Sequence, residues 1–497
     1  MLTQEDEYFE DDMIVEFYYD NTRVGYWKWV PLRVRYDKTN ELRAGGKNYG
    51  NAYHVANSNW HSIHNPVTDE MISTGLHIPE TIIDGDVYYN RSGSRTNTRP
   101  LRDFHNSYVK RKLILGVAQR DDTLIDYAVG KAGDLPKWVA ARLKFVFGID
   151  VSKDNIENHI DGACARYLNY RKMHKYMPGA LFVTGNSGLV KGNVGLSIRS
   201  GKAFASEKDR QIALAVFGQG AKDKNELGEG VYKRYGIGEE GFQISSCQFA
   251  LHYFFKDEPS MHAFIQNVAE CTKLNGYFIG TCYDGQVVFD LLKKKRRTES
   301  FSIYREEQKV YEITKQYDHT GFPEDETSLG YVVDVYQESI NNTFSEYLVN
   351  FPYLIRVMEN YGFALVTSEE AASMGLPNGT GLFSELYATM MSELERDPRK
   401  ADEYGDAGRL TKEEKQISFL NRYFVFRKTH NVNADKVGKL MRRRVDEGEN
   451  EEVADVIERV EATETALNQQ KDPPKRHIIR KIRAKTDDIK ITIKPKE

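Results

Sequence analysis

Residues 123–135 have the sequence TLIDYAVGKAGDL, in which an apolar strand runs through a glycine-bearing turn into a helix. A second apolar strand is predicted over residues 144–149, and Asp150 follows it about 20 residues after Gly130, a spacing typical of nucleotide-binding α/β units. Glycine lets the backbone approach a ligand closely, and an acid after the second strand can bind both hydroxyls of a ribose. The dinucleotide pattern G-x-G-x-x-G is absent, so a strand–turn–helix without a ligand is the alternative interpretation.

Strands alternate with helices on both sides of this stretch. Helices are predicted over residues 101–115, 135–142, 154–170, 259–271 and 348–361, and further strands over 241–247, 276–280, 331–336 and 420–427. This alternation implies a doubly wound, mostly parallel sheet, so we expect an α/β fold of the Rossmann-like class. Residues 185–241 are rich in Gly and Lys and interrupt the alternation, as a long insertion or a set of loops would.

The composition limits the class of protein. A length of 497 residues suggests about two to four folding units. The net charge is −4, so any nucleic-acid site must be a local patch. The cysteines are scattered, without a Cys-x-x-Cys pair, and indicate neither a disulfide framework nor a zinc site, so no metal is expected. The N-terminus is acidic, and no segment reaches the roughly 20 apolar residues that span a bilayer. We expect an intracellular, cytoplasmic protein without membrane contact.

The chain is expected to divide into four regions. Residues 13–36 alternate apolar and polar side chains, and residues 1–84 are interpreted as the end of a β-rich domain. Residues 85–100 are polar and are expected to form a linker or a surface arm. The α/β pattern fills residues 101–430, and residues 431–497 form a charged, helix-prone segment with a basic tail. The tail, residues 471–497, is expected to be disordered and to bind RNA non-specifically.

Three motifs carry a resemblance to a known family. They are LRDFHNSYVK at 101–110, GKAGDLPKW at 130–138 and GFQISSCQFALHY at 241–253. They resemble, in the same order, the motifs of the mRNA cap guanine-N7 methyltransferases, of which the last is long and rarely imitated. The resemblance covers about residues 100–430. It implies a class I methyltransferase that transfers methyl from S-adenosylmethionine to the 5′ cap guanine of GpppN-ended RNA.

The same resemblance implies roles for individual residues. Those implied for cofactor binding are Lys110, Asp126, Gly130, Gly133, Asp150, Asn186 and Gln248. Those implied for cap binding are Asn106, Gln248, Phe249, His252, Tyr253, Glu346 and Tyr423. Among them, Glu346, Tyr253 and His252 would position the guanine, with Glu346 accepting hydrogen bonds at its edge. Lys110 would meet the methionine carboxylate of the cofactor, and Asp150 would hold the ribose.

The chain departs from the family pattern at three positions. Ala132 stands where a glycine is usual, which removes one methyl of clearance near the cofactor. Val129 replaces a usual small residue or cysteine. Asn186 takes the approximate place of the acid that contacts the adenine amino group, and its amide oxygen can still accept that hydrogen bond.

The chemistry of the implied reaction agrees with the lack of a catalytic triad or metal cluster. Guanine N7 has an in-plane lone pair and no proton, so methyl transfer is a direct in-line displacement that needs no general base. A carboxylate such as Glu346 can offset the positive charge that the purine gains. Aromatic faces, for which Tyr253, Tyr423 and Phe249 are candidates, bind the methylated cation.

Each implied residue also has a structural interpretation. Lys110 could be a solvated charge on a helix, and His252 a satisfied interior histidine. Glu346 could stand at the start of the predicted helix 348–361, where the helix dipole favours a negative charge. Tyr423 lies in an aromatic strand and could belong to the core.

The N-terminal residues carry a second resemblance. WVPLRVRYDKT at 29–39 looks like the closing motif of guanylyltransferases, and VANSNWHSI at 55–63 follows as in the capping enzymes of large DNA viruses. This resemblance implies the C-terminal end of an OB-fold. The guanylyltransferase nucleophile motif Lys-x-Asp-Gly is absent, because no lysine stands two residues before Asp161 or Asp284 in the chain's Asp-Gly pairs.

A truncated or split capping enzyme is therefore expected. Its partners would be a guanylyltransferase or triphosphatase chain or a small stimulatory subunit, and its location a viral factory or virion if the source is viral. Two other functions remain open. One is a non-catalytic cap- or RNA-binding subunit, which Ala132 and Asn186 would favour. The other is methylation of another RNA position such as a ribose 2′-oxygen, which the string Gln248, His252 and Tyr253 argues against.

Overall fold

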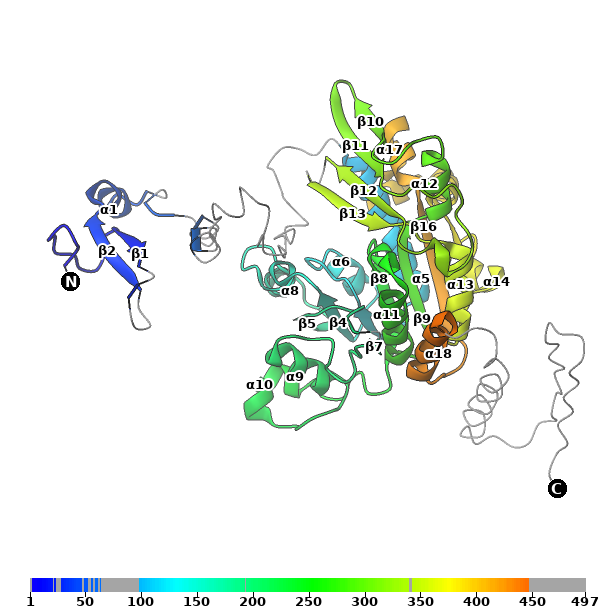
Figure 1. Cartoon of the computed structure of the whole chain (residues 1–497), viewed down its shortest axis with the longest axis horizontal. Helices are drawn as coiled ribbons and strands as arrows, with labels where there is room; N and C mark the ends of the chain where they lie inside the picture. Colours follow the sequence, from blue (N-terminus) through cyan, green and yellow to red (C-terminus); the bar gives the residue numbers. More distant parts are fainter. Residues whose placement is uncertain are drawn as a thin grey trace, which may run out of the picture. The chain divides into compact units, whose positions relative to one another are not determined.

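The computed structural model describes residues 2–63, with gaps at 21, 24–27, 47–48, 52–54, 57–58 and 61–62, and residues 98–446, with gaps at 193 and 339–341; side chains are described up to residue 441. The chain divides into two compact units, residues 1–85 and 86–497 (Figure 1). The expected tail and most of the expected linker lie outside the described residues. Among the described helices, none has both the length and the apolar character to cross a lipid bilayer.

The first unit contains a small antiparallel sheet. Strand β1 (Val15–Tyr19) pairs with β2 (Trp29–Val34), and helix α1 (Tyr36–Arg43) follows. Two strands are too few for a stable isolated sheet. The ring of Trp60 stacks on that of Trp29, the first residue of β2, with centroids 6.0 Å apart. A β-rich domain and an OB-fold remnant over residues 1–84 both stay predictions.

The second unit is built on a mixed eight-stranded sheet in the order β14-β16-β9-β8-β3-β4-β5, with β15 also paired to β16. Its strands are β3 (Thr123–Asp126), β4 (Phe145–Asp150), β5 (Gly179–Thr184), β8 (Phe242–Gln248), β9 (Thr272–Tyr283), β14 (Phe363–Leu365), β15 (Thr380–Leu382) and β16 (Asn421–Lys428). The five strands from β9 to β5 are parallel to one another, whereas β16 runs antiparallel to β9 and to β14. The predicted doubly wound α/β fold is therefore confirmed.

Helices cover both faces of this sheet, which explains why its central strands β3, β4 and β8 are almost entirely buried. One face is packed by α9 (Glu207–Val216), α11 (Glu258–Cys271), α13 (Phe351–Asn360) and α18 (Ala434–Asp446). The other is packed by the π-helix η1 (Phe104–Lys110), α5 (Arg111–Val117), α6 (Leu135–Ala140), α14 (Ser368–Ser373) and α15 (Phe383–Arg396). Successive residues of a strand serve opposite faces, as Leu124 and Ile125 of β3 do.

A four-stranded antiparallel sheet is inserted between β9 and α13. It consists of β10 (Ser300–Arg305), β11 (Gln308–Lys315), β12 (Val332–Gln337) and β13 (Asn342–Tyr347), paired in sequence order. Its inner face packs on α12 (Gly285–Leu292) and on Tyr283 at the end of β9. This small sheet brings β13 close to the carboxyl end of β8 in the large sheet, where the candidate active site lies.

Several element boundaries differ from the predicted ones. The helix predicted over residues 154–170 is two helices, α7 (Lys153–Glu157) and α8 (Ala163–Met173), because the Asn158 side chain accepts bonds from the backbone N–H groups of Ile160 and Asp161 and turns the chain between them. Residues 185–241 are not only loops, since they contain β6 (Val190–Lys191), β7 (Val194–Gly195), α9 and α10 (Lys224–Tyr232). Helix α4 (Arg99–Asp103) begins inside the range predicted as a linker, with a proline in its first turn.

Candidate active site

The carboxyl ends of the parallel strands gather most of the predicted polar residues at one edge of the sheet. Asp126 ends β3, Asp150 ends β4 and Gln248 ends β8. Asn186 follows β5 by two residues, and Tyr283, which the sequence analysis did not single out, ends β9. Ligands of open α/β sheets bind outside this edge, so these residues define the place of a candidate active site.

Asp150 organises the turn after β3. Its Oδ2 accepts a hydrogen bond from the backbone N–H of Gly130 at 2.7 Å, and its Oδ1 accepts bonds from Ser152 N and Asn155 Nδ2, both at 3.0 Å. Burial raises the pKa of Asp150, and these three bonds oppose that shift. A carboxylate can accept about four hydrogen bonds, so acceptor capacity is left for a ligand hydroxyl.

The turn itself is shaped by two residues with left-handed backbone angles. Gly130 has φ +52° and Ala132 has φ +53°. The left-handed conformation is strained for any residue with a Cβ, which gives a physical reason why glycine is usual at the position of Ala132. Nothing lies within 4 Å of the point where a Cβ of Gly133 would stand. The turn therefore combines local strain with open space beside Gly133.

A group of buried charges lies behind the turn. Asp134 is in contact with the ammonium groups of Lys137 at 2.8 Å and Lys110 at 3.6 Å. Burial alone would raise the pKa of Asp134, but the two lysines outweigh it and lower the pKa to about 2. Burial and the neighbouring Asp134 carboxylate raise the pKa of Asp126 to about 8. The structure thus brings Lys110, which the π-helix η1 carries, next to the predicted cofactor turn.

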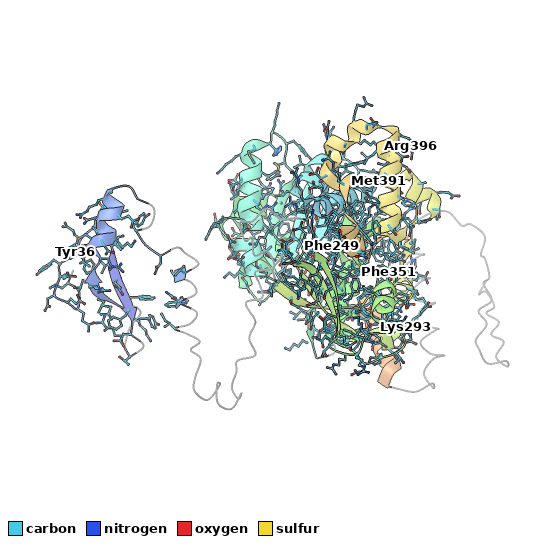
Figure 2. All side chains as sticks on the ribbon, turned by 90° about the horizontal axis from the view of Figure 1, so that it is seen from above. Tyr36, Phe249, Lys293, Phe351, Met391 and Arg396 are labelled. Atoms are coloured by element: carbon cyan, nitrogen blue, oxygen red, sulfur yellow. The ribbon has the colours of Figure 1, made fainter. Side chains whose placement is uncertain are left out.

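Phe249 connects this group to the next motif. It lies near the middle of the second unit (Figure 2) and has φ +56°, a strained angle of the kind that clusters at functional sites. The Lys110 ammonium is 5.4 Å from its ring centroid, and the His105 ring stacks on it at 5.2 Å. Sequence reasoning missed His105, whose position one residue before Asn106 was the available signal.

His252 and Glu346 face each other in the interior. His252 belongs to the short helix η2 (Leu251–Lys256) and Glu346 to β13, and their Nε2 and Oε2 atoms are 3.5 Å apart. The side chains are 3% and 6% exposed, and in the described residues neither imidazole nitrogen nor Glu346 Oε2 has a hydrogen-bond partner. The rings of Tyr253 and Tyr283 lie 4.2 and 6.4 Å from that of His252.

Unpaired buried polar groups are uncommon in folded proteins and call for an explanation such as a ligand. The structure also decides one alternative, because Glu346 lies on a strand opposite Val333 and not in the first turn of a helix. The N-cap of α13 is Asn350, so the helix-dipole interpretation of Glu346 does not apply. His252 is equally not a satisfied interior histidine.

Both members of the pair are neutral near pH 7. Burial raises the pKa of Glu346 to about 8 and lowers the pKa of His252 to about 3. The neighbouring Tyr283 and Tyr311 hydroxyls have pKa values raised by burial. The burial of this pair therefore favours an uncharged carboxyl beside an uncharged imidazole, and a ligand that offers hydrogen-bond donors would favour ionisation of Glu346.

The raised pKa of Glu346 gives a pH prediction. Its contribution to stability is present below the unfolded pKa and is lost as the pH rises through its folded value of about 8. Between about pH 6 and pH 9, the melting temperature of the parent should fall further than that of Glu346→Gln, which cannot titrate there. Calorimetry without ligand in matched buffers measures both, and a pH-independent difference between them would contradict the pKa shift.

Three of the residues predicted to bind the cofactor or the cap have their polar groups bonded elsewhere in the protein. The Asn106 side chain donates to Arg102 O at 3.0 Å, and Asn186 Oδ1 accepts from Gly188 N at 3.0 Å. Tyr423 is 0% exposed in the core between the sheet and α15, and its hydroxyl donates to Asn378 O at 2.9 Å. Tyr423 lies on the face of β16 that α15 covers, and packing there fixes the direction of its side chain. The structure therefore favours the core interpretation of Tyr423.

Tyr423→Phe tests this placement. The change removes the hydrogen bond donated to Asn378 O and the one accepted from Asn378 N, and should lower the free energy of unfolding by about 1–3 kcal/mol. The kinetic constants for capped RNA should stay within a factor of about two, because the side chain is enclosed by core residues. Thermal unfolding and initial rates on one preparation measure both quantities. A rise in KM for the cap without a matching loss of stability would instead indicate that Tyr423 contacts the cap.

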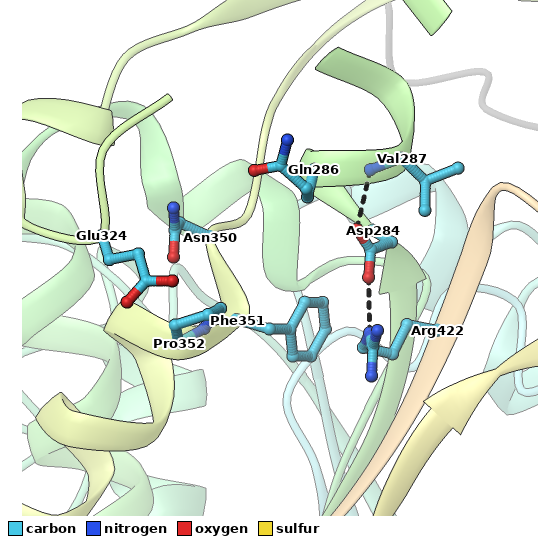
Figure 3. A pocket seen from close by; sticks show the side chains of 8 residues that line it. All are labelled: Asp284, Gln286, Val287, Glu324, Asn350, Phe351, Pro352 and Arg422. Carbon is cyan, nitrogen blue, oxygen red and sulfur yellow. Dashed lines mark hydrogen bonds and ion pairs between the residues drawn. The ribbon is translucent and has the colours of Figure 1, made fainter. Parts of the chain in front are cut away.

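A cavity of about 240 Å³ lies beside the starts of α12 and α13 (Figure 3). Asp284 caps α12 by accepting from Val287 N at 2.9 Å and also pairs with Arg422. None of the predicted site residues lines this cavity, and its charged groups within the described residues are already paired. The buried, unpaired groups at His252 and Glu346 therefore mark the candidate site better than the cavity does.

Comparison with known proteins shows what part of the second unit is similar to. Residues 202–429 match the sequence profile of the mRNA (guanine-N(7))-methyltransferase domain. The matched range contains Gln248, His252 and Glu346, and the Gly130 turn precedes it in the same sheet.

Proteins similar to this chain occur in viruses and in a plant. The chain is 27% identical to the probable mRNA-capping enzyme of Acanthamoeba polyphaga mimivirus over 87% of its length. It is 28% identical to mRNA cap guanine-N(7) methyltransferase 1 of Arabidopsis thaliana over 40%, and 22% identical to the mRNA-capping enzyme of African swine fever virus over 72%. The chain spans only 37%, 42% and 36% of these three relatives, respectively.

Proposed function

We propose that this chain transfers a methyl group from S-adenosylmethionine to guanine N7 of the cap in GpppN-ended RNA. The observation that carries the proposal is the buried, unpartnered pair of His252 and Glu346 in a domain of the cap methyltransferase family. Guanine offers two donors on one edge, N1–H and the 2-amino group, which suit a carboxylate acceptor. An unpaired buried acceptor is disfavoured, so a guanine base fits this pair and an adenine base does not.

The residues at the turn after β3 fit S-adenosylmethionine. The space beside Gly133 accommodates a ligand against the backbone, and Asp150 has acceptor capacity left for ribose hydroxyls. Lys110 offers a positive charge for the carboxylate of an amino acid, and the buried Asp126 offers carboxyl oxygens for its ammonium group, whose charge would favour ionisation of Asp126. When bound, S-adenosylmethionine supplies a methyl group on a positively charged sulfur.

The chain's own residues act by position and charge. N7 has no proton to remove, so no side chain needs to serve as a general base. Tyr253 and Tyr283 flank His252 and restrict the plane of a bound base, while the buried surroundings exclude water. Glu346 offsets the positive charge that develops on the purine. The expected guanylyltransferase, triphosphatase or stimulatory partners and a cytoplasmic location stay predictions.

Methylation of capped RNA with labelled cofactor, followed by nucleoside analysis, tests the proposal. 7-Methylguanosine as the labelled product supports it. A labelled 2′-O-methylnucleoside would establish a different target. Cap binding without any transfer, by protein that also binds the cofactor, would establish a non-catalytic subunit and overturn the catalytic claim.

A further inference from the structure

One segment of the second unit has an unusual charge distribution. Residues 162–206 contain no Asp or Glu, although the whole chain has 73 acidic and 69 basic residues. The segment's Lys and Arg residues are Arg166, Arg171, Lys172, Lys175, Lys191, Arg199 and Lys202. A chain of net charge −4 thus concentrates positive charge in one place, which is the electrostatic condition for a local polyanion site.

Helix α8 is the centre of this segment and contributes little to the core. Of its 11 residues only Ala163 is buried. Helix α8 lies near β5, the strand at the free edge of the sheet (Figure 1). Tyr167 holds the helix there, because its hydroxyl donates to Pro178 O at 2.8 Å and its ring packs edge-on against Phe182 of β5 at 6.0 Å. Tyr170 also packs partly against the core, and the exposed side chains of α8 are left to serve the surface.

The basic side chains at the end of α8 are exposed. Arg171, Lys172 and Lys175 have no acidic partner among the described residues. Aromatic rings are interleaved with them, because Tyr170 and His174 stack with centroids 5.1 Å apart at 14°. Exposed cations alternating with aromatic faces are typical of surfaces that bind single-stranded nucleic acid, where phosphates meet the cations and bases stack.

We propose that the outer face of α8, continued to Tyr176, binds the single-stranded body of the RNA whose cap enters the active site. The inference rests on the proposed function, since it assigns the rest of the same substrate. RNA is favoured over an acidic protein because aromatic rings stand among the cations, and base stacking uses both. Helix α8 also begins next to Asp161, which pairs with Lys131 of the cofactor turn at 2.8 Å.

The reach of the RNA sets a length requirement. Three strand spacings separate β8 from β5, about 14 Å, and α8 extends about 16 Å further. At about 3.4 Å per stacked nucleotide, these distances together correspond to roughly nine nucleotides. A capped RNA of about 20 nucleotides should therefore contact α8, whereas the dinucleotide GpppG should not.

The full chain carrying Arg171→Gln, Lys172→Gln and Lys175→Gln tests the proposal. Its matched control carries Lys293→Gln, Lys294→Gln and Arg296→Gln, an equal loss of charge from exposed residues after α12 (Figure 2 labels Lys293 at the periphery of the unit). Fluorescence anisotropy measures the Kd of a 20-nucleotide capped RNA at several salt concentrations. Initial rates measure the methylation of GpppG and of the same RNA.

Loss of three phosphate contacts should reduce the slope of log Kd against log salt by about two in the α8 variant. Between about 50 and 200 mM salt, the parent should then lose about 20-fold more affinity than this variant. The KM for GpppG should not change. Equal effects in the control, or an unchanged RNA affinity in the α8 variant, as expected if the face binds an acidic protein, would overturn the inference. Absence of methylation by the parent would count against the proposed function alone, because the binding measurement stands without it.

Discussion

Replacing Glu346 with alanine should lower kcat/KM for methylation of a GpppA-ended substrate by about 100-fold or more. The side chain is buried and its Oε2 has no partner among the described residues, so it is available to the two donors of guanine. Each hydrogen bond to a charged group contributes about 1.5–3 kcal/mol. Removal of both, together with the counter-charge to the developing cation, accounts for an effect of that size.

The conservative variant Glu346→Gln separates charge from shape. Its amide can accept one of the two bonds, so KM should rise only a few-fold, whereas kcat should fall by about tenfold because the counter-charge is lost. Above about pH 8, Glu346→Gln should be more stable than the parent, because the parent must hold an ionised carboxylate in the interior. A loss of activity with equal or higher melting temperature is the pattern of a functional residue.

Initial rates with GpppA and ApppA on the parent, on both Glu346 variants and on Glu312→Gln measure these effects. Glu312 lies on β11 of the same small sheet but on the opposite face, bonded to Ser302 and Lys309, and is the matched control. The parent should reject ApppA. Unchanged turnover in Glu346→Gln would remove Glu346 from the chemistry, and equal losses in Glu312→Gln would indicate a general effect on the sheet.

The second large effect is expected for Asp150→Ala. The Kd for S-adenosylmethionine should rise roughly 10- to 150-fold, which corresponds to the loss of about 1.5–3 kcal/mol from a charged acceptor. The structure adds a loss of stability, because the change also leaves the N–H groups of Gly130 and Ser152 and the Asn155 amide without their acceptor. Each such buried group costs about 1–3 kcal/mol.

Isothermal titration with the cofactor and, separately, with a cap analogue tests this assignment. Asn155→Ala is the control, because it removes one donor to the same carboxylate and leaves the carboxylate in place. It should lower the melting temperature but change cofactor affinity much less than Asp150→Ala does. Equal losses of cofactor and cap affinity in Asp150→Ala would point to a disrupted fold instead of a cofactor contact.

Much of the fold could be predicted because it is encoded locally. The strands β3 and β4 are buried throughout and mostly apolar, since helices bury both of their faces, and such runs are visible in the sequence. The position of Asp150 at the end of β4 follows from the length of one strand–helix unit. The helix predicted over residues 154–170 failed because one Asn side chain ends the helical hydrogen bonds, and the insertion at 185–241 lacks periodicity even though it contains two helices.

The candidate site shows the same division. Strand ends carry Asp126, Asp150 and Gln248 to one sheet edge, and this was predictable because parallel strands end together. The proximity of Glu346 and His252 was supplied by resemblance alone, since His252 lies on the short helix η2 and Glu346 on β13 of the small sheet, and no local pattern links them. Tyr283, on the strand end beside Gln248, was overlooked although its position could have been inferred from the same rule.

By itself, the sequence determined the order of strands and helices, the ligand-facing turn and the family of its motifs. Only the tertiary structure decided which side chains share an interior. The two faces of a strand are chemically similar when both are buried. The packing partners of β16, and not its sequence, therefore decide that the Tyr423 side chain lies in the core. The same packing leaves Glu346 and His252 buried without partners and leaves α8 on the surface, because burial is a property of contacts between distant segments.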